Sequence, residues 1–214
     1  EDDIDIEKVK VTYFDLALRK FITGVNEEKI TNRVPIFSIK DGKYVYTHTK
    51  EPIEVSNGDT VIYTLRIYNE GSRAEYAEEV KDDIPEGLEF LPDNSINNEY
   101  RWIMYNAAGE ETNNIEDAVT IKTDYLSKEQ EIATGRENLL NGFDTTTMTQ
   151  PDYKDLKIAF KVIEPNTSDR IIINTAEISE DANKDGKPVD DIDSTPNNDK
   201  EGEDDIDIEK VKVT

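Results

Sequence analysis

The chain has 214 residues, of which 35% are hydrophobic, and its 25 basic and 49 acidic side chains give a formal net charge of −24. A field of this sign repels nucleic acid and anionic membrane surfaces, which argues against both as partners, and it attracts divalent cations. The hydrophobic share lies below the roughly 45–50% of an ordinary globular domain, so the core must be concentrated in some segments while others stay solvated.

The sequence has no cysteine and one histidine, His48, which argues against zinc and copper sites. It has no signal peptide and no apolar run of the ~18 residues that a transmembrane helix needs, so we expect no membrane insertion. Nothing resembles a nucleophile-elbow motif, and we expect that the chain is not an enzyme. A glycosidase needs only two acids and therefore stays open as a weaker alternative.

The twelve residues EDDIDIEKVKVT occur twice, as residues 1–12 (the first copy) and as residues 203–214 (the second copy). A cut through a tandem array with a period of 202 residues would leave such a match, and a cloning artefact or duplicated tag is the alternative. Arrays of large repeats are typical of structural or adhesive proteins. We therefore predict an inter-repeat junction strand at 1–12, a repeat domain at 13–180, and an acidic junction with the first segment of the next repeat at 181–214.

Between the acidic ends, apolar residues alternate with a period of two, which is typical of half-buried strands. The alternating runs are 13–22, 60–68, 76–84, 119–121, 156–162 and 172–178, and the turn signals between them include Asp41-Gly42, Asn57-Gly58, Glu70-Gly71, Pro85-Glu86-Gly87 and Ala108-Gly109. Residues 128–140 favour a short helix and 144–150 a Thr-rich loop, while the strand order in 24–52 and 94–155 stays open. We predict an all-β fold, namely an immunoglobulin-like antiparallel β-sandwich with extended loops and an acidic calcium-binding junction.

Three polar residues occupy positions where the alternation requires a core residue. Lys20 continues the face of Phe14, Leu16 and Leu18, Asn174 lies between Ile172 and Ala176, and Asp82 lies between Val80 and Ile84. If the first and last strands lie side by side, as is common in a sandwich, the Lys20 amine meets the Asn174 amide within reach of Asp82.

Burial favours the neutral amine, which is nucleophilic, and a protonated Asp82 can polarise the Asn174 carbonyl and transfer protons. Fixed proximity then permits a Lys–Asn isopeptide bond with loss of ammonia. One alternative is a buried Lys–Asp ion pair with an Asn hydrogen bond. Another is that a β-bulge shifts the face by one residue and turns the lysine outward.

Residues 53–93 resemble the conserved repeat of bacterial surface proteins called domain of unknown function eleven. The resemblance lies in Gly58-Asp59 before an aromatic strand, the Asn69-Glu-Gly71 turn, and the signature Asp82-Asp83-Ile84-Pro85-Glu-Gly87-Leu88. Residues 14–23 resemble the first strand of large repeats in Gram-positive wall-anchored proteins, and IINTAEIS (172–179) resembles the terminal strand. Such repeats resemble the collagen-adhesin class of immunoglobulin-like domains, which implies an autocatalytic isopeptide formed by Lys20, Asp82 and Asn174.

The acidic stretch at 181–207 favours calcium, which prefers six to eight hard oxygen ligands. Asp181-x-Asn183-x-Asp185-Gly186 has the opening spacing of a calcium loop, but Ile192 replaces the Glu that an EF-hand needs. A soluble acidic linker is the alternative. The candidate metal ligands are Asp181, Asn183, Asp185, Asp190, Asp191, Asp193, Asn197, Asp199, Asp204, Asp205 and Asp207.

These observations predict a structural stalk or adhesin repeat of a bacterial cell-surface protein, extracellular and wall-anchored, with neighbouring repeats as partners. An isopeptide bond and calcium at the junctions would stabilise it. One alternative is a host-protein or glycan binding module with Trp102, Tyr100 and Tyr105 as an aromatic platform. Another is a calcium-triggered unit that assembles head to tail into fibres, since the strand-like tail at 209–214 fits a sheet edge of its own molecule or of a neighbour.

Overall fold

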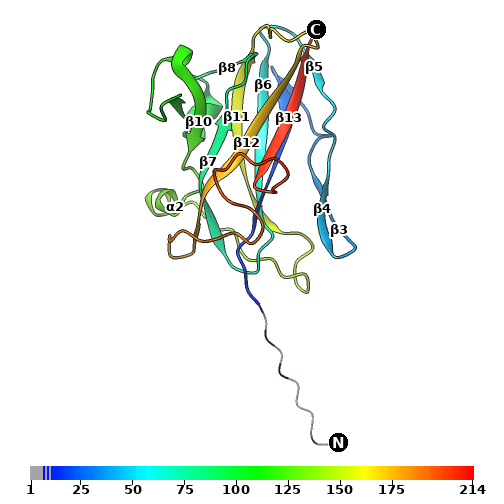
Figure 1. Ribbon diagram of the computed structural model, residues 1–214, viewed down its shortest axis with the longest axis vertical. Helices are drawn as coiled ribbons and strands as arrows, with labels where there is room; N and C mark the ends of the chain where they lie inside the picture. The colour runs from blue at the N-terminus through cyan, green and yellow to red at the C-terminus, as the bar shows by residue number, and fades with distance from the viewer. Residues whose placement is uncertain (1–6, 8, 10) are drawn as a thin grey trace, which may run out of the picture.

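The computed structural model describes residue 7, residue 9 and residues 11–214, so the junction strand predicted at 1–12 lies mostly outside the described residues. The described chain forms two packed β-sheets, a two-stranded hairpin and short helices (Figure 1). The predicted all-β fold and the antiparallel β-sandwich are confirmed.

The first sheet has five strands and is built around β6 (Thr60–Asn69). β1 (Leu16–Val25) and β11 (Asp152–Val162) pair with its two sides, and β2 (Glu28–Lys29) and β8 (Leu88–Phe90) form the edges. All of these pairings are antiparallel. The three long strands coincide with the alternating runs predicted at 13–22, 60–68 and 156–162.

The second sheet has six strands in the order β5 (Ile53–Val55), β13 (Ile206–Val213), β12 (Ile171–Asn183), β7 (Glu75–Asp83), β10 (Ala118–Thr123) and β9 (Ile103–Asn106). Its pairings are antiparallel except that of β13 with β5, which is parallel. The segment that we assigned to a junction therefore supplies an interior strand of this sheet. The sandwich is larger than the predicted domain 13–180.

The regions of uncertain strand order supply the edges and connections. Residues 24–52 contain β2 and the hairpin of β3 (Ile36–Lys40) and β4 (Lys43–Thr47). Residues 94–155 contain α1 (Ser95–Glu99), β9, a 3-10 turn η1 (Ile115–Asp117), β10 and α2 (Lys128–Thr134). The helix predicted at 128–140 forms but ends early, because Gly135 adopts a left-handed conformation with φ 71° and its N–H bonds to the Glu131 carbonyl.

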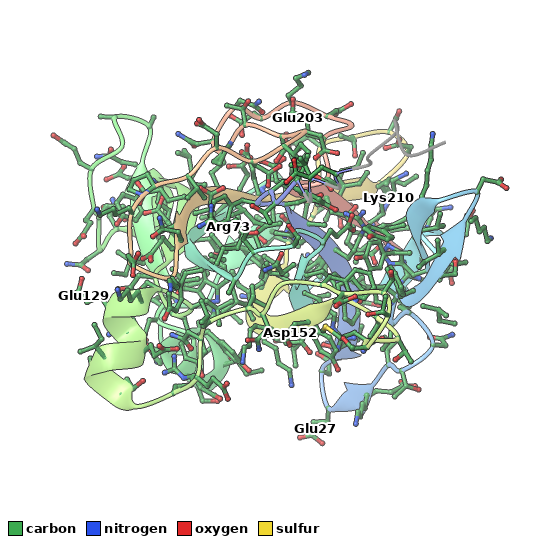
Figure 2. The ribbon with its side chains drawn as sticks, turned by 90° about the horizontal axis from the view of Figure 1, so that it is seen from below. Glu27, Arg73, Glu129, Asp152, Glu203 and Lys210 are labelled. Carbon is green, nitrogen blue, oxygen red and sulfur yellow. The ribbon has the colours of Figure 1, made fainter. Side chains whose placement is uncertain are left out.

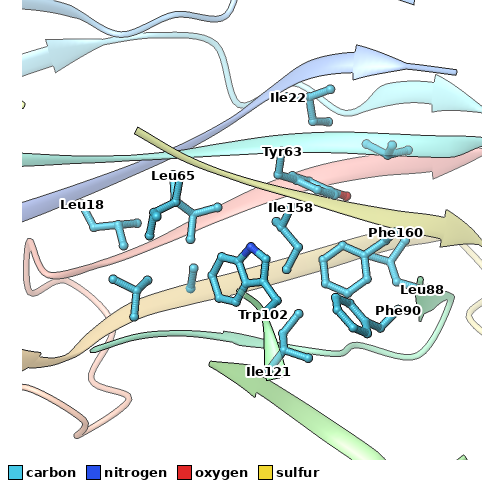
Figure 3. Packing of buried hydrophobic residues seen from close by; sticks show 14 of the residues in the cluster. Leu18, Ile22, Tyr63, Leu65, Leu88, Phe90, Trp102, Ile121, Ile158 and Phe160 are labelled. Carbon is cyan, nitrogen blue, oxygen red and sulfur yellow. The ribbon is translucent and has the colours of Figure 1, made fainter. Parts of the chain in front are cut away.

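The core lies between the two sheets and is made from their alternating inward faces. Figure 3 shows Tyr63 and Leu65 of β6 and Ile158 of β11 facing Ile121 of β10, with Trp102 between the sheets. Trp102 is 7% exposed and its Nε1 donates to the Lys157 carbonyl over 2.7 Å. The suggested aromatic platform is therefore wrong for Trp102, because its ring fills the core and its polar atom is bonded inside.

Gly87 packs where β8 begins, after the predicted Pro85-Glu86-Gly87 turn. Its φ is +98°, and a Cβ built on it would lie 2.5 Å from Ile172 Cδ1. Gly58 has a similar φ of +95° but has open space around it. The two glycines therefore share the backbone conformation and differ in packing.

We predict that Gly87→Ala destabilises the protein by about 1–3 kcal/mol more than Gly58→Ala, because both variants strain the backbone and only the first overpacks the core. Urea unfolding of the two variants measures the difference. Equal losses would contradict the close packing of Gly87 against Ile172.

Candidate functional site

Lys20, Asp82 and Asn174 come together at the centre of the sandwich, and each is fully buried. Lys20 lies on β1, and its Nζ donates a hydrogen bond to Asp82 Oδ2 on β7. Ala176 of β12 lies opposite Asp82, so Asn174, two residues along the same face, is the diagonal neighbour of Asp82. The predicted faces of all three strands are correct, and no bulge turns Lys20 outward.

The route by which these residues meet differs from the predicted one. β1 and β12 do not pair side by side, because they belong to different sheets. The side chain of Lys20 instead crosses the interior, while Asp82 and Asn174 face it from neighbouring strands of the opposite sheet. A Lys20–Asn174 bond would therefore join the two layers of the sandwich.

Two opposing electrostatic effects act on Lys20 and Asp82. Burial lowers the pKa of Lys20, although the neighbouring Asp82 opposes that shift. Burial likewise raises the pKa of Asp82 to about 6, against the effect of Lys20. The centroid of the Tyr63 ring lies 5.0 Å from Lys20 Nζ. Burial thus shifts both groups toward their uncharged forms, whereas their contact favours the charged pair.

The Asn174 amide is the unusual member of the trio. It lies close enough to Asp82 to lower the pKa of that carboxyl, yet neither Nδ2 nor Oδ1 makes a hydrogen bond of normal geometry. Buried side-chain amides in native proteins are nearly always hydrogen-bonded, because an unsatisfied buried polar group costs about 1–3 kcal/mol. The Asn174 amide is thus buried without the hydrogen bonds that usually offset the free-energy cost of burial.

A second group of polar residues lies at the end of the sandwich where β1 begins. Asp15 belongs to two sets of carboxylates, one with Asp191 and Asp193 and the other with Glu70 and Asp204. Within each set, one oxygen atom from each carboxylate lies within 4.8 Å of the others. We call these five residues the acid cluster. Asp15 is 6% exposed, and its Oδ1 has no hydrogen-bond partner, as is also true of Asp204 Oδ1.

The backbone around the acid cluster fixes its carboxylates. Asp191 Oδ2 accepts from Leu16 N over 2.9 Å, while its Oδ1 accepts from Asp193 N over 3.1 Å. The Asp15 carbonyl accepts from Glu70 N over 2.8 Å, and the Asp204 carbonyl accepts from Leu18 N over 2.7 Å. Chain segments far apart in the sequence are thereby bound to the start of β1. Figure 2 views the molecule from the end where this cluster lies.

Burial is the main cause of the raised pKa values in the acid cluster, and mutual repulsion adds to it. The pKa of Asp15 rises to about 9 through burial and then through Asp204 and Asp191. The pKa of Asp204 rises to about 8 through burial and then through Asp193 and Glu70. Such carboxyls take up either protons or a cation at neutral pH. A set made only of carboxylate oxygens suits a hard cation such as calcium.

Some of the predicted metal ligands lie in the acid cluster, and others bind lysine side chains instead. Asp191, Asp193 and Asp204 lie in the acid cluster. Lys81 Nζ binds Asn197 over 3.0 Å and Asp199 over 2.6 Å, and Lys50 Nζ binds Asp207 over 2.7 Å. These three side chains therefore have protein partners.

The remaining predicted ligands lie outside the two carboxylate groups found in the described part of the chain. Asn183 Oδ1 accepts from the backbone of Asp185 within a turn, and Asp185 and Asp190 are exposed. Asp181 and Asp205 are buried, and burial raises the pKa of Asp181 to about 6 and that of Asp205 to about 7. Asp205 has two unpartnered oxygens, but no neighbouring acids converge on it in the way they do on Asp15.

Sequence reasoning missed Asp15 and Glu70. Both lie far from the acidic stretch at 181–207, and in a chain with 49 acids neither stands out. In the sequence, Glu70 could be noticed only because it lies in the Asn69-Glu70-Gly71 turn. Asp15 could be noticed only because it directly precedes β1. Only the folded arrangement brings them to residues 191–204.

No family model matches this chain, and no curated protein matches it. One structural match is a chain in a crystal structure of a complex of CaDoc0917 with CaCohA2; it has 14% sequence identity, covers 76% of this chain and 95% of that chain, and has a TM-score of 0.34. Within the described residues, no helix is long and apolar enough to span a membrane.

We predict that the melting temperature in chelator falls as the pH rises from about 4 to about 9. The folded-state pKa of Asp15, about 9, lies above its ordinary value of 3.8, so the folded protein holds protons more tightly than the unfolded chain. The stability contributed by this proton is complete at low pH and is lost as the pH rises through that window. Differential scanning calorimetry checks this.

The variant Asp15→Asn is the control for this titration, since it cannot ionise at that position. Its melting temperature should depend less on pH than that of the wild type over the same range. Parallel curves for the two proteins would contradict the raised pKa of Asp15.

Proposed function

We propose that this chain is a structural stalk repeat of a bacterial cell-surface protein, and that an internal Lys20–Asn174 isopeptide bond and calcium stabilise it. The observation that carries the proposal is the buried trio. A lysine, an aspartate and an asparagine whose amide makes no hydrogen bond of normal geometry are enclosed together in the core, beside the buried Glu209 that lies opposite Asn174 on β13. An ion pair alone explains Lys20 and Asp82 but leaves the buried Asn174 amide without a hydrogen bond of normal geometry.

The proposed reaction uses only groups that are present in the core. The neutral Lys20 amine attacks Cγ of Asn174, while the protonated Asp82 donates to the amide oxygen and so stabilises the developing negative charge. Asp82 then accepts a proton from the attacking nitrogen and delivers it to Nδ2. As the C–N bond to Nδ2 breaks and ammonia leaves, the proton on the oxygen returns to Asp82, and a Lys20 Nζ–Asn174 Cγ amide remains. Atoms balance without a cofactor, and the reaction occurs once per molecule.

A mechanical role follows from where the bond would lie. It would join β1, at the start of the described fold, to β12, which pairs with the final strand β13. A load entering at one end and leaving at the other would then bypass the residues between 20 and 174. Since the sequence contains no cysteine, this bond would provide the covalent reinforcement that disulfides give other extracellular domains.

The acid cluster supports calcium as part of the same proposal. Asp15, Glu70, Asp191, Asp193 and Asp204 would hold the ion, which would neutralise carboxylates that otherwise repel one another. Because these residues come from the start of β1, the end of β6 and the segment before β13, the ion would fasten three parts of the fold together. Binding to the folded state alone stabilises it by about 2.7 kcal/mol at a free ion concentration of 100 times the Kd.

The isopeptide proposal predicts that the intact mass of the protein falls short of its sequence mass by one ammonia. Lys20→Ala and Asp82→Asn should both restore the full mass, the first by removing the nucleophile and the second by removing the proton carrier. Asp83→Asn is the matched control, because its carboxylate accepts from Thr120 Oγ1 outside the trio, and it should keep the mass deficit.

Intact-mass spectrometry, followed by identification of the branched peptide that joins Lys20 to Asn174, gives the answer. A wild-type protein with its full sequence mass would refute the bond. It would leave the trio as a buried ion pair beside an asparagine.

The calcium proposal predicts that a chelator lowers the melting temperature of the wild type and that added calcium restores it. Glu70→Gln should reduce this response, because it removes one charge from the acid cluster. Asp185→Asn removes an exposed charge outside the cluster and should leave the response unchanged. A wild-type melting curve that is the same in calcium and in chelator would remove calcium from the account.

A further inference from the structure

The second copy of the repeated segment forms β13, which lies between β12 and β5 in the six-stranded sheet; we call this position the slot. β13 pairs with β12 from Ile171 opposite Lys212 to Glu177 opposite Ile206, and it pairs in parallel with β5 on its other side. Val211 and Val213 are buried in the core. A strand in the slot is thus held by backbone pairing with both neighbouring strands and by side chains that pack into the core.

Charged residues around the slot also restrict which segment can occupy it. Glu209 is fully buried, and its Oε1 lies 2.7 Å from Arg33 Nη2. Asp207 accepts from Lys20 N over 2.7 Å and also binds Lys50. Asp204 belongs to the acid cluster. A segment that enters this slot must therefore present acids and valines in the same order.

The first copy presents that order, residue for residue. Its Glu7, Val9 and Val11 correspond to Glu209, Val211 and Val213, and its Asp2 corresponds to Asp204. We propose that the first copy of one molecule can replace β13 in the slot of a second molecule, so that the chain assembles head to tail by strand exchange. Each contact of β13 would be remade by an identical residue.

The direction of the strands excludes the slot of the same molecule. Tyr13 follows the first copy directly, and its N–H donates to Ser72 Oγ beyond the end of β6. The last residue of a strand in the slot, Thr214, donates to the Val55 carbonyl before the start of β6. The ten residues of β6 span roughly 30 Å, whereas consecutive Cα atoms are about 3.8 Å apart. A first copy in its own slot could not reach its own Tyr13.

The same geometry allows the first copy to enter the slot of a second molecule. A first copy that fills the slot would end beside Val55, and Tyr13 of its own domain would follow at once. The two domains would then be joined end to end without a linker. Figure 1 shows the start of the described chain and the C-terminus at opposite ends of the sandwich, as such stacking requires.

The second copy competes with exchange because it is tethered to its own slot by residues 184–205. A short flexible tether corresponds to an effective concentration of the order of millimolar, so the closed monomer is favoured in dilute solution. Exchange should therefore become visible when the second copy is disabled.

The test compares variants of the 214-residue chain by size-exclusion chromatography with light scattering. Val211→Asp with Val213→Asp expels the second copy, and this double variant should form oligomers whose mass at least doubles as the concentration is raised. Adding Val9→Asp and Val11→Asp disables the first copy as well, and this quadruple variant should be monomeric. A double variant that stays monomeric, or that associates to the same extent as the quadruple variant, overturns the proposal.

A second measurement keeps the wild-type core intact. Ile173 lies opposite Lys210 in the β12–β13 pair, so Lys8 of an exchanged strand would lie opposite Ile173 of the other molecule. Single variants Lys8→Cys and Ile173→Cys, mixed at high concentration and oxidised, should give a disulfide between these two positions, identified by peptide mass. Ile173→Cys with Lys210→Cys in one chain is the positive control. Absence of the mixed disulfide under conditions where the control forms also overturns the proposal.

Discussion

The contact between Lys20 and Asp82 across the two sheets is the constraint on which the rest of the structure depends. Charged groups are excluded from a sandwich core unless they are paired, because burial of a lone charge costs several kcal/mol. The pair therefore fixes the registers of β1 and β7, since a shift by one residue in either strand would place one charge alone inside the core. The Asn174 amide lies beside Asp82 in the same part of the core, as the proposed amide exchange would require.

The alternation of apolar residues predicted the long strands and the inward direction of Lys20, Asp82 and Asn174, because side-chain direction in a strand depends only on local period. It did not predict that Lys20 would cross between layers, since sheet order is set by contacts far apart in the sequence. Val119 shows the same limit at a smaller scale: a register shift between Ala118 and Thr120 leaves it 44% exposed, although Ile121 is buried.

The acidic segment shows where composition alone is insufficient. Its density of carboxylates indicated a cation site but not which oxygens converge. Lys81 binds Asn197 and Asp199. Asp204 is instead held near Asp15 and Glu70 by its carbonyl, which accepts a hydrogen bond from Leu18 N at the start of β1. A linear pattern cannot show such a selection, because it depends on which side chains are already neutralised by lysines when the chain is folded.

The placement of β13 has a consequence for how the molecule would resist being stretched. Its ladder with β12 runs along nearly its whole length, and β5 adds a parallel ladder near Thr214. Tension applied at Tyr13 and at Thr214, which lie at opposite ends of the sandwich, acts along these strands rather than across them. The backbone hydrogen bonds would then be loaded in shear, so that they share the force and must fail together instead of unzipping one after another.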